Sequence, residues 1–286
     1  MHFRSDLATE CRDPLRQAPG LHFEEEQAEG YHISRLQVKD EQGSRAIGKP
    51  VGMYITIELP PLGEYAELFG PGMERAAEEL RALLPREGAV LVVGLGNDRM
   101  TPDALGPRCC AQVFATRHIT GELAQSAGLG GLRPVACLTP GVLGRTGVES
   151  GELIAAAAGA LRPAAVITVD ALAARRMSRL GCTLQISDSG IVPGSGVGNA
   201  RLEISRATMG APVVALGVPT VVDAATLVSD LTENAQAKPP QDYEGMMVTP
   251  REVDLLVERA AKLCAMAINR ALQPHLQVED LLELME

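Results

Sequence analysis

Two aspartates that follow short β-branched runs are the residues best placed for acid and base chemistry. Asp103 comes after the run 90–93 and a glycine-containing turn at 94–97, and Asp170 directly follows the run 166–169. Ligands bind outside the carboxyl ends of the strands in an open parallel sheet, so we expect the two carboxylates to converge. Two neighbouring carboxylates can share a proton, which leaves one as a base toward water and the other as an acid toward a carbonyl or a leaving amine. This pattern predicts hydrolysis without a metal or a covalent nucleophile.

Each aspartate also has a structural interpretation. Asp103 lies in a turn before a predicted helix, where a carboxylate is typical of a helix cap. Asp170 follows an apolar run that would desolvate it, so a buried ion pair with Arg175 or Arg176 is its alternative. The sequence leaves these interpretations open.

The remaining motifs predict no cofactor and no metal. The loop at 94–97 begins like a dinucleotide-binding turn, but Arg99 stands where the third glycine would be. A second glycine-rich segment, 187–199, lacks the lysine and hydroxyl residue of a phosphate loop. It could bind a peptide backbone or form a tight connection. His118 has no neighbouring histidine at metal-ligand spacing, and we expect it near the end of the helix after Asp103.

Composition narrows the class of protein. The chain has 286 residues, 46% of them hydrophobic and only 3% aromatic, which predicts one α/β domain with a core of small aliphatic side chains. A net charge of −10 argues against direct binding of nucleic acid through its phosphates. Six cysteines without a C-x-x-C pair are typical of reduced cytoplasmic thiols. No apolar stretch is long enough for a membrane span, and no signal pattern opens the chain.

The arrangement of apolar runs predicts how the aspartates are positioned. Strands at 31–38 and 53–59 indicate a β-rich N-terminal edge, followed by a helix at 71–84. Strands at 89–93, 134–138, 165–169, 183–186 and 213–216 then alternate with helical patterns. This alternation predicts a mostly parallel sheet flanked by helices in three layers. A last helix is expected to begin at Pro250, with Thr249 as its N-cap and Glu252 completing a capping box.

Several blocks, in order over nearly the whole chain, are more specific than any single motif. They are 4–10 (RSDLATE), 46–49 (AIGK), 92–97 (VVGLGN), 101–107 (TPDALGP), 140–142 (PGV), 169–175 (VDALAAR), 185–191 (QISDSGI), 193–199 (PGSGVGN), 217–224 (GVPTVVDA) and 247–250 (MVTP). In these blocks the chain resembles the germination proteases of spore-forming bacteria. Those endopeptidases degrade small acid-soluble spore proteins when a spore germinates.

The resemblance implies an atypical aspartic endopeptidase whose catalytic pair is Asp103 and Asp170. It also implies a fold similar to that of hydrogenase-maturation endopeptidases, a homotetramer, small acid-soluble spore proteins as substrates, and a place in the cytoplasm of the forespore or spore core. A metal-dependent peptidase of the maturation type and a non-catalytic peptide-binding relative are the alternatives. We expect four further residues to position substrate or support the catalytic pair: Asn97, His118, Asp188 and Gly196.

The first residues resemble a cleavage site of the same family. Its substrates are cut after the acid in segments similar to Thr/Ser-Glu-Ile/Phe-Ala-Ser-Glu, and residues 5–10 read Ser-Asp-Leu-Ala-Thr-Glu. The resemblance therefore implies self-cleavage between Asp6 and Leu7, which makes residues 1–6 a short zymogen propeptide. The alternative is an ordinary solvated terminus.

Overall fold

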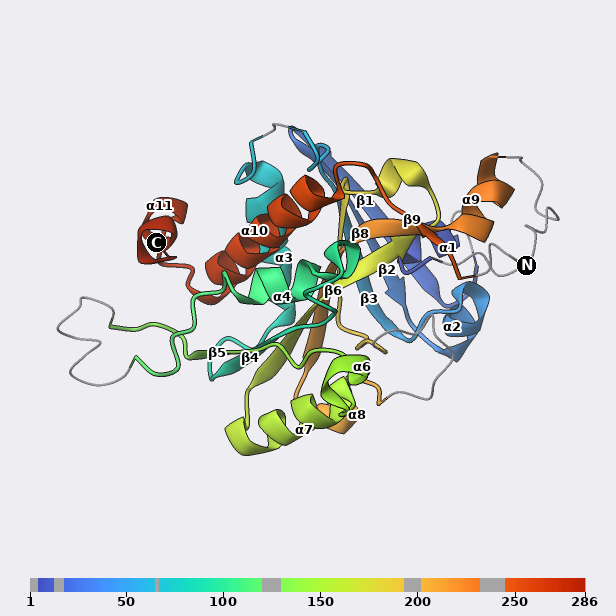
Figure 1. Cartoon of the computed structure of the whole chain (residues 1–286). Helices are drawn as coiled ribbons and strands as arrows, with labels where there is room; N and C mark the ends of the chain where they lie inside the picture. Colours follow the sequence, from blue (N-terminus) through green and yellow to red (C-terminus); the bar gives the residue numbers. More distant parts are fainter. Residues whose placement is uncertain are drawn as a thin grey trace.

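The computed structural model describes residues 5–12, 18–64, 67–119, 130–192, 202–231 and 245–285. These residues form one sheet with helices on both faces (Figure 1). Its strands run β1-β2-β3-β7-β8-β6-β4-β5 across the sheet, and β9 pairs with β8. In chain order they are β1 (Leu21–Ala28), β2 (Tyr31–Val38), β3 (Gly52–Glu58), β4 (Val90–Gly94), β5 (Val135–Leu138), β6 (Ala165–Ala174), β7 (Thr183–Ser187), β8 (Val213–Asp223) and β9 (Met247–Val248). The predicted α/β fold with flanking helices is confirmed.

Strand direction divides the sheet into two halves. β4 pairs in parallel with β5 and β6, and β6 pairs in parallel with β8. β1, β2, β3 and β7 are antiparallel to one another in that order, and β7 is antiparallel to β8. The predicted β-rich N-terminal edge is confirmed. It continues the same sheet, which is therefore mixed where a mostly parallel sheet was expected, because the antiparallel N-terminal strands join the parallel ones through β7. The sequence pattern did not predict β1, because the glutamates at 24–26 interrupt the alternation of apolar and polar residues.

One face of the sheet is covered by α3 (Pro71–Leu83), α4 (Leu105–Cys110) and α10 (Val253–Leu272). Alternate strand residues, such as Val90 and Val92 of β4, point into this layer because successive side chains leave a strand on opposite faces. Helix α10 begins three residues later than the start we expected at Pro250. Its N-cap is Glu252, no side chain caps it, and the Thr249 hydroxyl instead donates to the Thr220 carbonyl at 2.9 Å.

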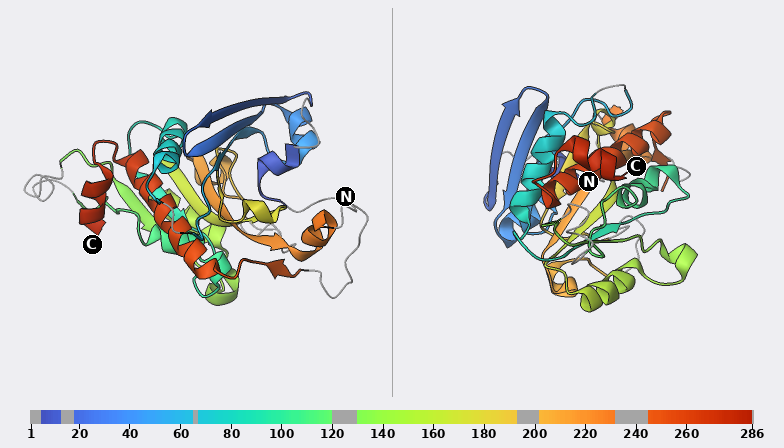
Figure 2. Two further views of the ribbon diagram at one scale, coloured as in Figure 1. Left: turned by 90° about the horizontal axis from the view of Figure 1, so that it is seen from above. Right: turned by 90° about the vertical axis from the view of Figure 1, so that its left-hand side faces the viewer.

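The opposite face is covered at two separate places. Helix α7 (Ser150–Leu161) and the short α8 (Arg206–Met209) pack on the parallel half, where Ile154 contacts the cluster of Leu91 and Val93. The short helices α1 (Ala8–Arg12) and α2 (Glu41–Ile47) lie over the antiparallel half, against Leu36 and Tyr54. Figure 2 shows α1 and α2 well separated from α7. The part of this face between the two groups lines a cavity.

The remaining described elements are short or lie near the C-terminus. They are the 3-10 turns η1 (Thr101–Asp103) and η2 (Met177–Arg179) and the helices α6 (Leu143–Thr146), α9 (Ala224–Leu231) and α11 (Val278–Met285). Within the described ranges, no helix combines the length and apolar character needed to cross a bilayer.

Candidate active site

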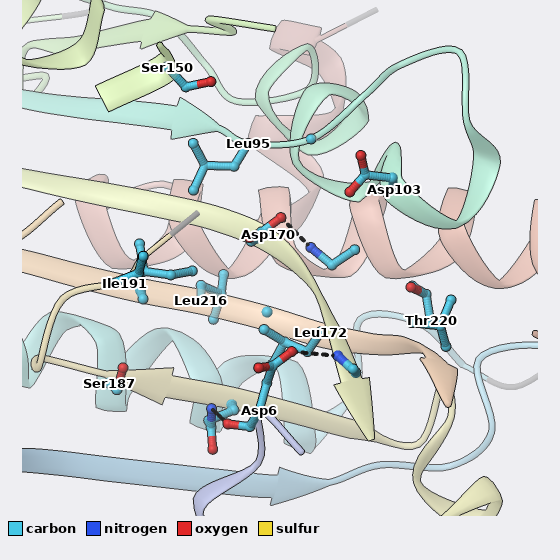
Figure 3. A pocket seen from close by; sticks show the side chains of 18 of the residues that line it. Asp6, Leu95, Asp103, Ser150, Asp170, Leu172, Ser187, Ile191, Leu216 and Thr220 are labelled. Atoms are coloured by element: carbon cyan, nitrogen blue, oxygen red, sulfur yellow. Dashed lines mark hydrogen bonds between the residues drawn. The ribbon is translucent and has the colours of Figure 1, made fainter. Parts of the chain in front are cut away.

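The cavity between the two helix groups has a volume of about 730 Å³, and both predicted catalytic aspartates line it. Figure 3 shows Asp103 and Asp170 facing the same space from different elements. The N-terminal segment, defined here as residues 5–12, reaches the cavity through Asp6. Other lining residues are Lys49, Tyr54, Leu95, Gly96, Ala173, Gln185, Ser187, Leu216 and Thr220.

The main chain that precedes Asp103 holds its carboxylate. The Asn97 amide donates to Asp103 Oδ2 at 2.8 Å and to the Asp103 carbonyl at 3.1 Å. Gly96 makes this approach possible, because its φ is +112° and a Cβ there would lie 2.0 Å from the Asp103 carbonyl oxygen. The N-cap of α4 is Ala104, and no side chain caps that helix. The interpretation of Asp103 as a helix cap is therefore wrong.

Two further contacts fix the Asp103 turn against the sheet. A Cβ on Gly106 would lie 2.4 Å from the Val169 carbonyl oxygen, so only glycine lets α4 sit this close to β6. On the other side, the buried Thr220 hydroxyl donates to the Pro102 carbonyl at 2.7 Å. The turn is therefore held by both β6 and β8, which fixes where the Asp103 carboxylate points.

Asp170 lies within β6 and not at its end, which corrects the sequence-based expectation. The strand continues to Ala174 beyond its last pairing with β4, which joins Val169 to Gly94. Period-two alternation puts Ile167 and Val169 in the core layer under α10, so the half-buried Asp170 points to the cavity face. Its Oδ1 accepts a hydrogen bond from the Ala171 amide at 2.9 Å.

The electrostatic surroundings of Asp170 favour its neutral form. Burial raises the pKa of Asp170 well above its usual range, and the nearby carboxylates of Asp103 and Asp6 raise it further, against a lowering by the Ala171 amide. Neither Arg175 nor Arg176 is among the groups that shift the pKa of Asp170, so its interpretation as a buried ion pair with either arginine is wrong. A protonated Asp170 beside a second carboxylate can act as a general acid.

The N-terminal segment binds along the part of β6 that extends past β4. The Asp6 amide donates to the Ala173 carbonyl at 2.8 Å, and the Ala173 amide donates to Asp6 Oδ2 at 2.8 Å. The Asp6 carbonyl accepts from Lys49 Nζ at 3.1 Å and from Gln185 Nε2 at 3.0 Å. Lys49 Nζ also donates to the Ser5 carbonyl at 2.9 Å.

The residues after Asp6 are held equally firmly. Leu7 is fully buried in an apolar cluster made by Leu172, Ala174, Leu180 and Val222. The Ala8 amide donates to Gln185 Oε1 at 2.7 Å, and the Glu10 carboxylate accepts from the amides of Arg175 and Arg176 at 2.6 and 2.9 Å. The interpretation of this segment as an ordinary solvated terminus is therefore wrong.

Asn97 and Asp188, two of the residues predicted to position substrate or support the catalytic pair, make other contacts than expected. Asn97 holds Asp103 through its main chain, while its side-chain Oδ1 accepts from the Arg99 amide at 3.1 Å. Asp188 is exposed and its Oδ1 accepts from the Met53 amide at 2.7 Å, which ties the end of β7 to β3. Neither side chain lines the cavity. Gly196, in the segment 193–201, lies outside the described residues.

His118 lies away from the cavity, contrary to expectation. Helix α4 ends at Cys110, and His118 lies in an exposed turn whose neighbour Arg117 donates its amide to the Val135 carbonyl at 2.9 Å. Val135 begins β5, at the end of the parallel strands opposite to Asp103. The chain therefore crosses the sheet before it reaches His118, which removes this imidazole from the site.

The polar residues of the cavity do not form a typical metal site. Its described lining has the carboxylates Asp6, Asp103, Asp170 and Glu203 but includes neither histidine nor cysteine. Across the described ranges, no group of three or more His, Cys, Asp and Glu side chains is arranged to hold a metal ion. Among the described residues, the cavity thus offers carboxylates that can give and take protons.

Three residues of the site were missed by the sequence reading. Lys49 closes the block 46–49, Gln185 is a buried amide in the apolar strand β7, and Thr220 is a buried hydroxyl in β8. A polar side chain within an apolar strand was the available signal for Gln185 and Thr220. No local pattern pointed to Lys49, because a lone lysine after a glycine is typical of a solvated turn.

Comparison with known proteins gives consistent matches over the whole chain. A family model described as germination protease matches residues 4–235. A germination protease from Caldanaerobacter subterraneus subsp. tengcongensis is 42% identical over 99% of this chain and 98% of its own length. One from Priestia megaterium is 35% identical over 97% of this chain and 95% of its own. A [NiFe] hydrogenase maturation protease, HycI from Thermococcus kodakarensis KOD1, aligns with 66% of this chain and 98% of its own, at 18% identity and a TM-score of 0.37.

Proposed function

The chain belongs to the germination protease family and is a peptidase, and from this premise we propose that Asp103 and Asp170 hydrolyse peptide bonds that follow an acidic residue. The observation that carries the proposal is the position of the chain's own Asp6–Leu7 bond. Asp6 lines the same cavity as both aspartates. The peptide bond that follows Asp6 lies between its carboxylate, which accepts from the Ala173 amide, and the buried side chain of Leu7. We therefore also propose that this bond is cleaved by the protein itself, which releases residues 1–6.

The chemistry follows from the unequal surroundings of the two carboxyl groups. Burial and the neighbouring carboxylates keep the pKa of Asp170 raised, so Asp170 supplies the proton. The Asp103 carboxylate accepts a hydrogen bond from the Asn97 amide at 2.8 Å, and a hydrogen bond from a main-chain amide favours a charged carboxylate. Asp103 is therefore the base that takes a proton from the attacking water.

The substrate class proposed is the small acid-soluble proteins of the spore, in the cytoplasm of the forespore and spore core. The segment bound in the cavity supports this, because its sequence at 5–10 resembles the sites at which such proteins are cut. We also propose a homotetramer, which light scattering after gel filtration tests. No cofactor is needed for the proposed reaction.

The experiment that tests the function compares the full chain with Asp103→Asn and Asp170→Asn. Intact-mass measurement follows the loss of residues 1–6, and peptide mapping follows the hydrolysis of a purified small acid-soluble spore protein. Asp98→Asn is the matched control, because Asp98 is an exposed residue of the same loop that does not line the cavity.

We expect both cavity variants to stay folded and to lose both cleavages, while the control keeps them. Full activity of Asp103→Asn and Asp170→Asn would contradict the proposal. Binding of the spore protein by the unmodified chain without hydrolysis would assign it to a peptide-binding role instead.

A further inference from the structure

We infer that Lys49 and Gln185 bind the carbonyl oxygen of the bond that is cleaved and stabilise the negative charge that develops on it. The inference rests on the proposed function and adds two residues to it. It also decides which atom receives the proton of Asp170.

The two donors converge on one oxygen from different elements. Lys49 follows α2 and Gln185 lies in β7, yet Lys49 Nζ and Gln185 Nε2 lie 3.1 and 3.0 Å from the Asp6 carbonyl oxygen. Both residues line the cavity that contains the aspartates. A positively charged and a neutral donor on one carbonyl oxygen match the arrangement that stabilises an oxyanion during acyl transfer.

The Gln185 side chain makes hydrogen bonds to the peptide on both sides of the Asp6–Leu7 bond. Its Nε2 donates to the Asp6 carbonyl before the bond, and its Oε1 accepts from the Ala8 amide at 2.7 Å after the bond. The side chain is buried, with 8% of its surface exposed, so water competes little for either contact. One amide group therefore sets the orientation of the carbonyl relative to the rest of the site.

Neighbouring contacts fix the acid and the residue that follows it. The Ala173 amide donates to the Asp6 carboxylate at 2.8 Å, and Leu7 fills an apolar cluster on the other side of the bond. The Leu7 amide, in the same peptide group as the Asp6 carbonyl, donates to Ser5 Oγ at 3.1 Å, and a rotation of the carbonyl would break that contact. Lys49 and Gln185 thus bind a carbonyl that the rest of the segment already presents to them.

These donors change the expected route of the protons. Water attacks the Asp6 carbonyl carbon and gives one proton to the Asp103 carboxylate, while the π electron pair of the carbonyl moves to oxygen beside Lys49 and Gln185. The pair returns as the bond from carbon to the Leu7 nitrogen breaks, and that nitrogen takes the proton of Asp170. The products are the α-carboxyl group of Asp6 and the amine of Leu7. Because the oxygen has its own donors, Asp170 is free to protonate the leaving amine.

The test measures self-cleavage of the full chain in single-turnover experiments by intact mass. Lys49→Met keeps the length of the side chain and removes its charge, and Gln185→Met removes the amide at similar volume. Lys39→Met is the matched control, because Lys39 is exposed and does not line the cavity. Lys49→Ala is measured with and without ethylammonium, which can supply the missing cation. Asp170→Asn is run in parallel, and thermal unfolding confirms that each variant is folded.

We expect Lys49→Met and Gln185→Met to slow cleavage by about 10²- to 10³-fold, the usual effect of losing one oxyanion donor. Ethylammonium should restore part of the Lys49→Ala rate and none of the Asp170→Asn rate, and Lys39→Met should cleave normally. A purely structural role for Lys49 would not respond to the amine.

The inference is overturned if folded Lys49→Met cleaves within about tenfold of the unmodified chain, a barrier change of only 1.4 kcal/mol. It is equally overturned if ethylammonium leaves the Lys49→Ala rate unchanged. Should the Lys49 variants not fold, Gln185→Met decides, and an unmodified rate in that variant rejects the inference. Loss of cleavage only in Asp103→Asn and Asp170→Asn would leave the proposed function intact and reject this inference alone.

Discussion

Asp6 and Ala173 exchange two hydrogen bonds of 2.8 Å, one between main chains and one from the Ala173 amide to the Asp6 carboxylate. The pairing is possible because β6 continues to Ala174 after its last pairing with β4 at Val169. Addition of an extended peptide to the edge of a sheet is a common way to bind a substrate, since main-chain bonds supply affinity and side-chain contacts supply specificity. At this edge the contact that selects an acidic side chain is the hydrogen bond from the Ala173 amide to the Asp6 carboxylate.

Replacing Asp6 tests this contact. Asp6→Ala removes the acceptor of the Ala173 amide, and losing a hydrogen bond to a charged group costs about 1.5–3 kcal/mol, which corresponds to a cleavage rate lower by roughly 10- to 100-fold. Asp6→Glu keeps a carboxylate and should cleave faster than Asp6→Ala. Time courses of intact mass measure both. Equal rates for the two variants would show that the acid is not recognised.

Truncation of Leu7 tests how the segment is anchored. Leu7→Ala leaves a cavity among Leu172, Ala174, Leu180 and Val222, and buried leucine-to-alanine changes cost about 2–5 kcal/mol. We expect the N-terminal segment to detach while the sheet stays folded. Hydrogen exchange should then become faster in peptides from 5–12 and unchanged in β4. Unchanged protection of the segment would contradict this anchoring role.

The stability of the protein should depend on the proton of Asp170. Because the pKa of Asp170 is raised in the folded state, the folded protein keeps this proton where the unfolded chain, with a pKa of about 3.9, has released it. The stabilising contribution is therefore present below about pH 4 and is lost as the pH rises toward the raised value. Asp170→Asn is neutral throughout and should have a higher Tm than the unmodified chain at pH 7. Thermal unfolding from pH 4 to 8, with Asp98→Asn as control, checks this, and identical pH dependence in both variants would refute it.

The rate of self-cleavage should also follow this proton. The proposed acid works only while Asp170 is protonated, so the rate should rise as the pH falls through the raised pKa of Asp170. At still lower pH the rate should fall again, because the base is then protonated too. Single-turnover rates over a pH series measure the profile. A rate that increases steadily toward alkaline pH would be incompatible with Asp170 as the acid.

Gly96→Ala tests the close approach that positions Asp103. Gly96 has a φ of +112°, and an alanine Cβ at this position would lie 2.0 Å from the Asp103 carbonyl oxygen. The loop would therefore have to move, and backbone strain of this kind costs about 1–3 kcal/mol. We expect a lower Tm and a cleavage rate reduced at least about tenfold, because a displaced base loses its alignment. Gly159→Ala in α7 is the control: nothing lies within 4 Å of its Cβ, and helix propensity should make it slightly stabilising. Normal cleavage by Gly96→Ala would show that the loop tolerates the shift.

Local patterns predicted much of this molecule. The β-branched runs predicted β4 and β6. The carboxylates after these runs predicted a shared site, because β4 and β6 are parallel neighbours and Gly94 at the end of β4 pairs with Val169, next to Asp170. The alternation of β6 also places Asp170 on the face opposite Ile167 and Val169, although the strand does not end there. These features depend on side-chain type and a period of two residues, and both are properties of a short stretch of chain.

Other parts of the site depended on how distant segments pack. Asp6 and Ala173 are separated by 167 residues, and Lys49 reaches the same segment from the end of α2, so no spacing in the sequence brings them together. His118 shows the reverse case, because the chain crosses the sheet and carries it away from Asp103. By itself the sequence determined which residues could supply acid and base. The tertiary structure decided which cation, which amide and which peptide bond meet them, because loop closure and burial in the folded chain set those contacts.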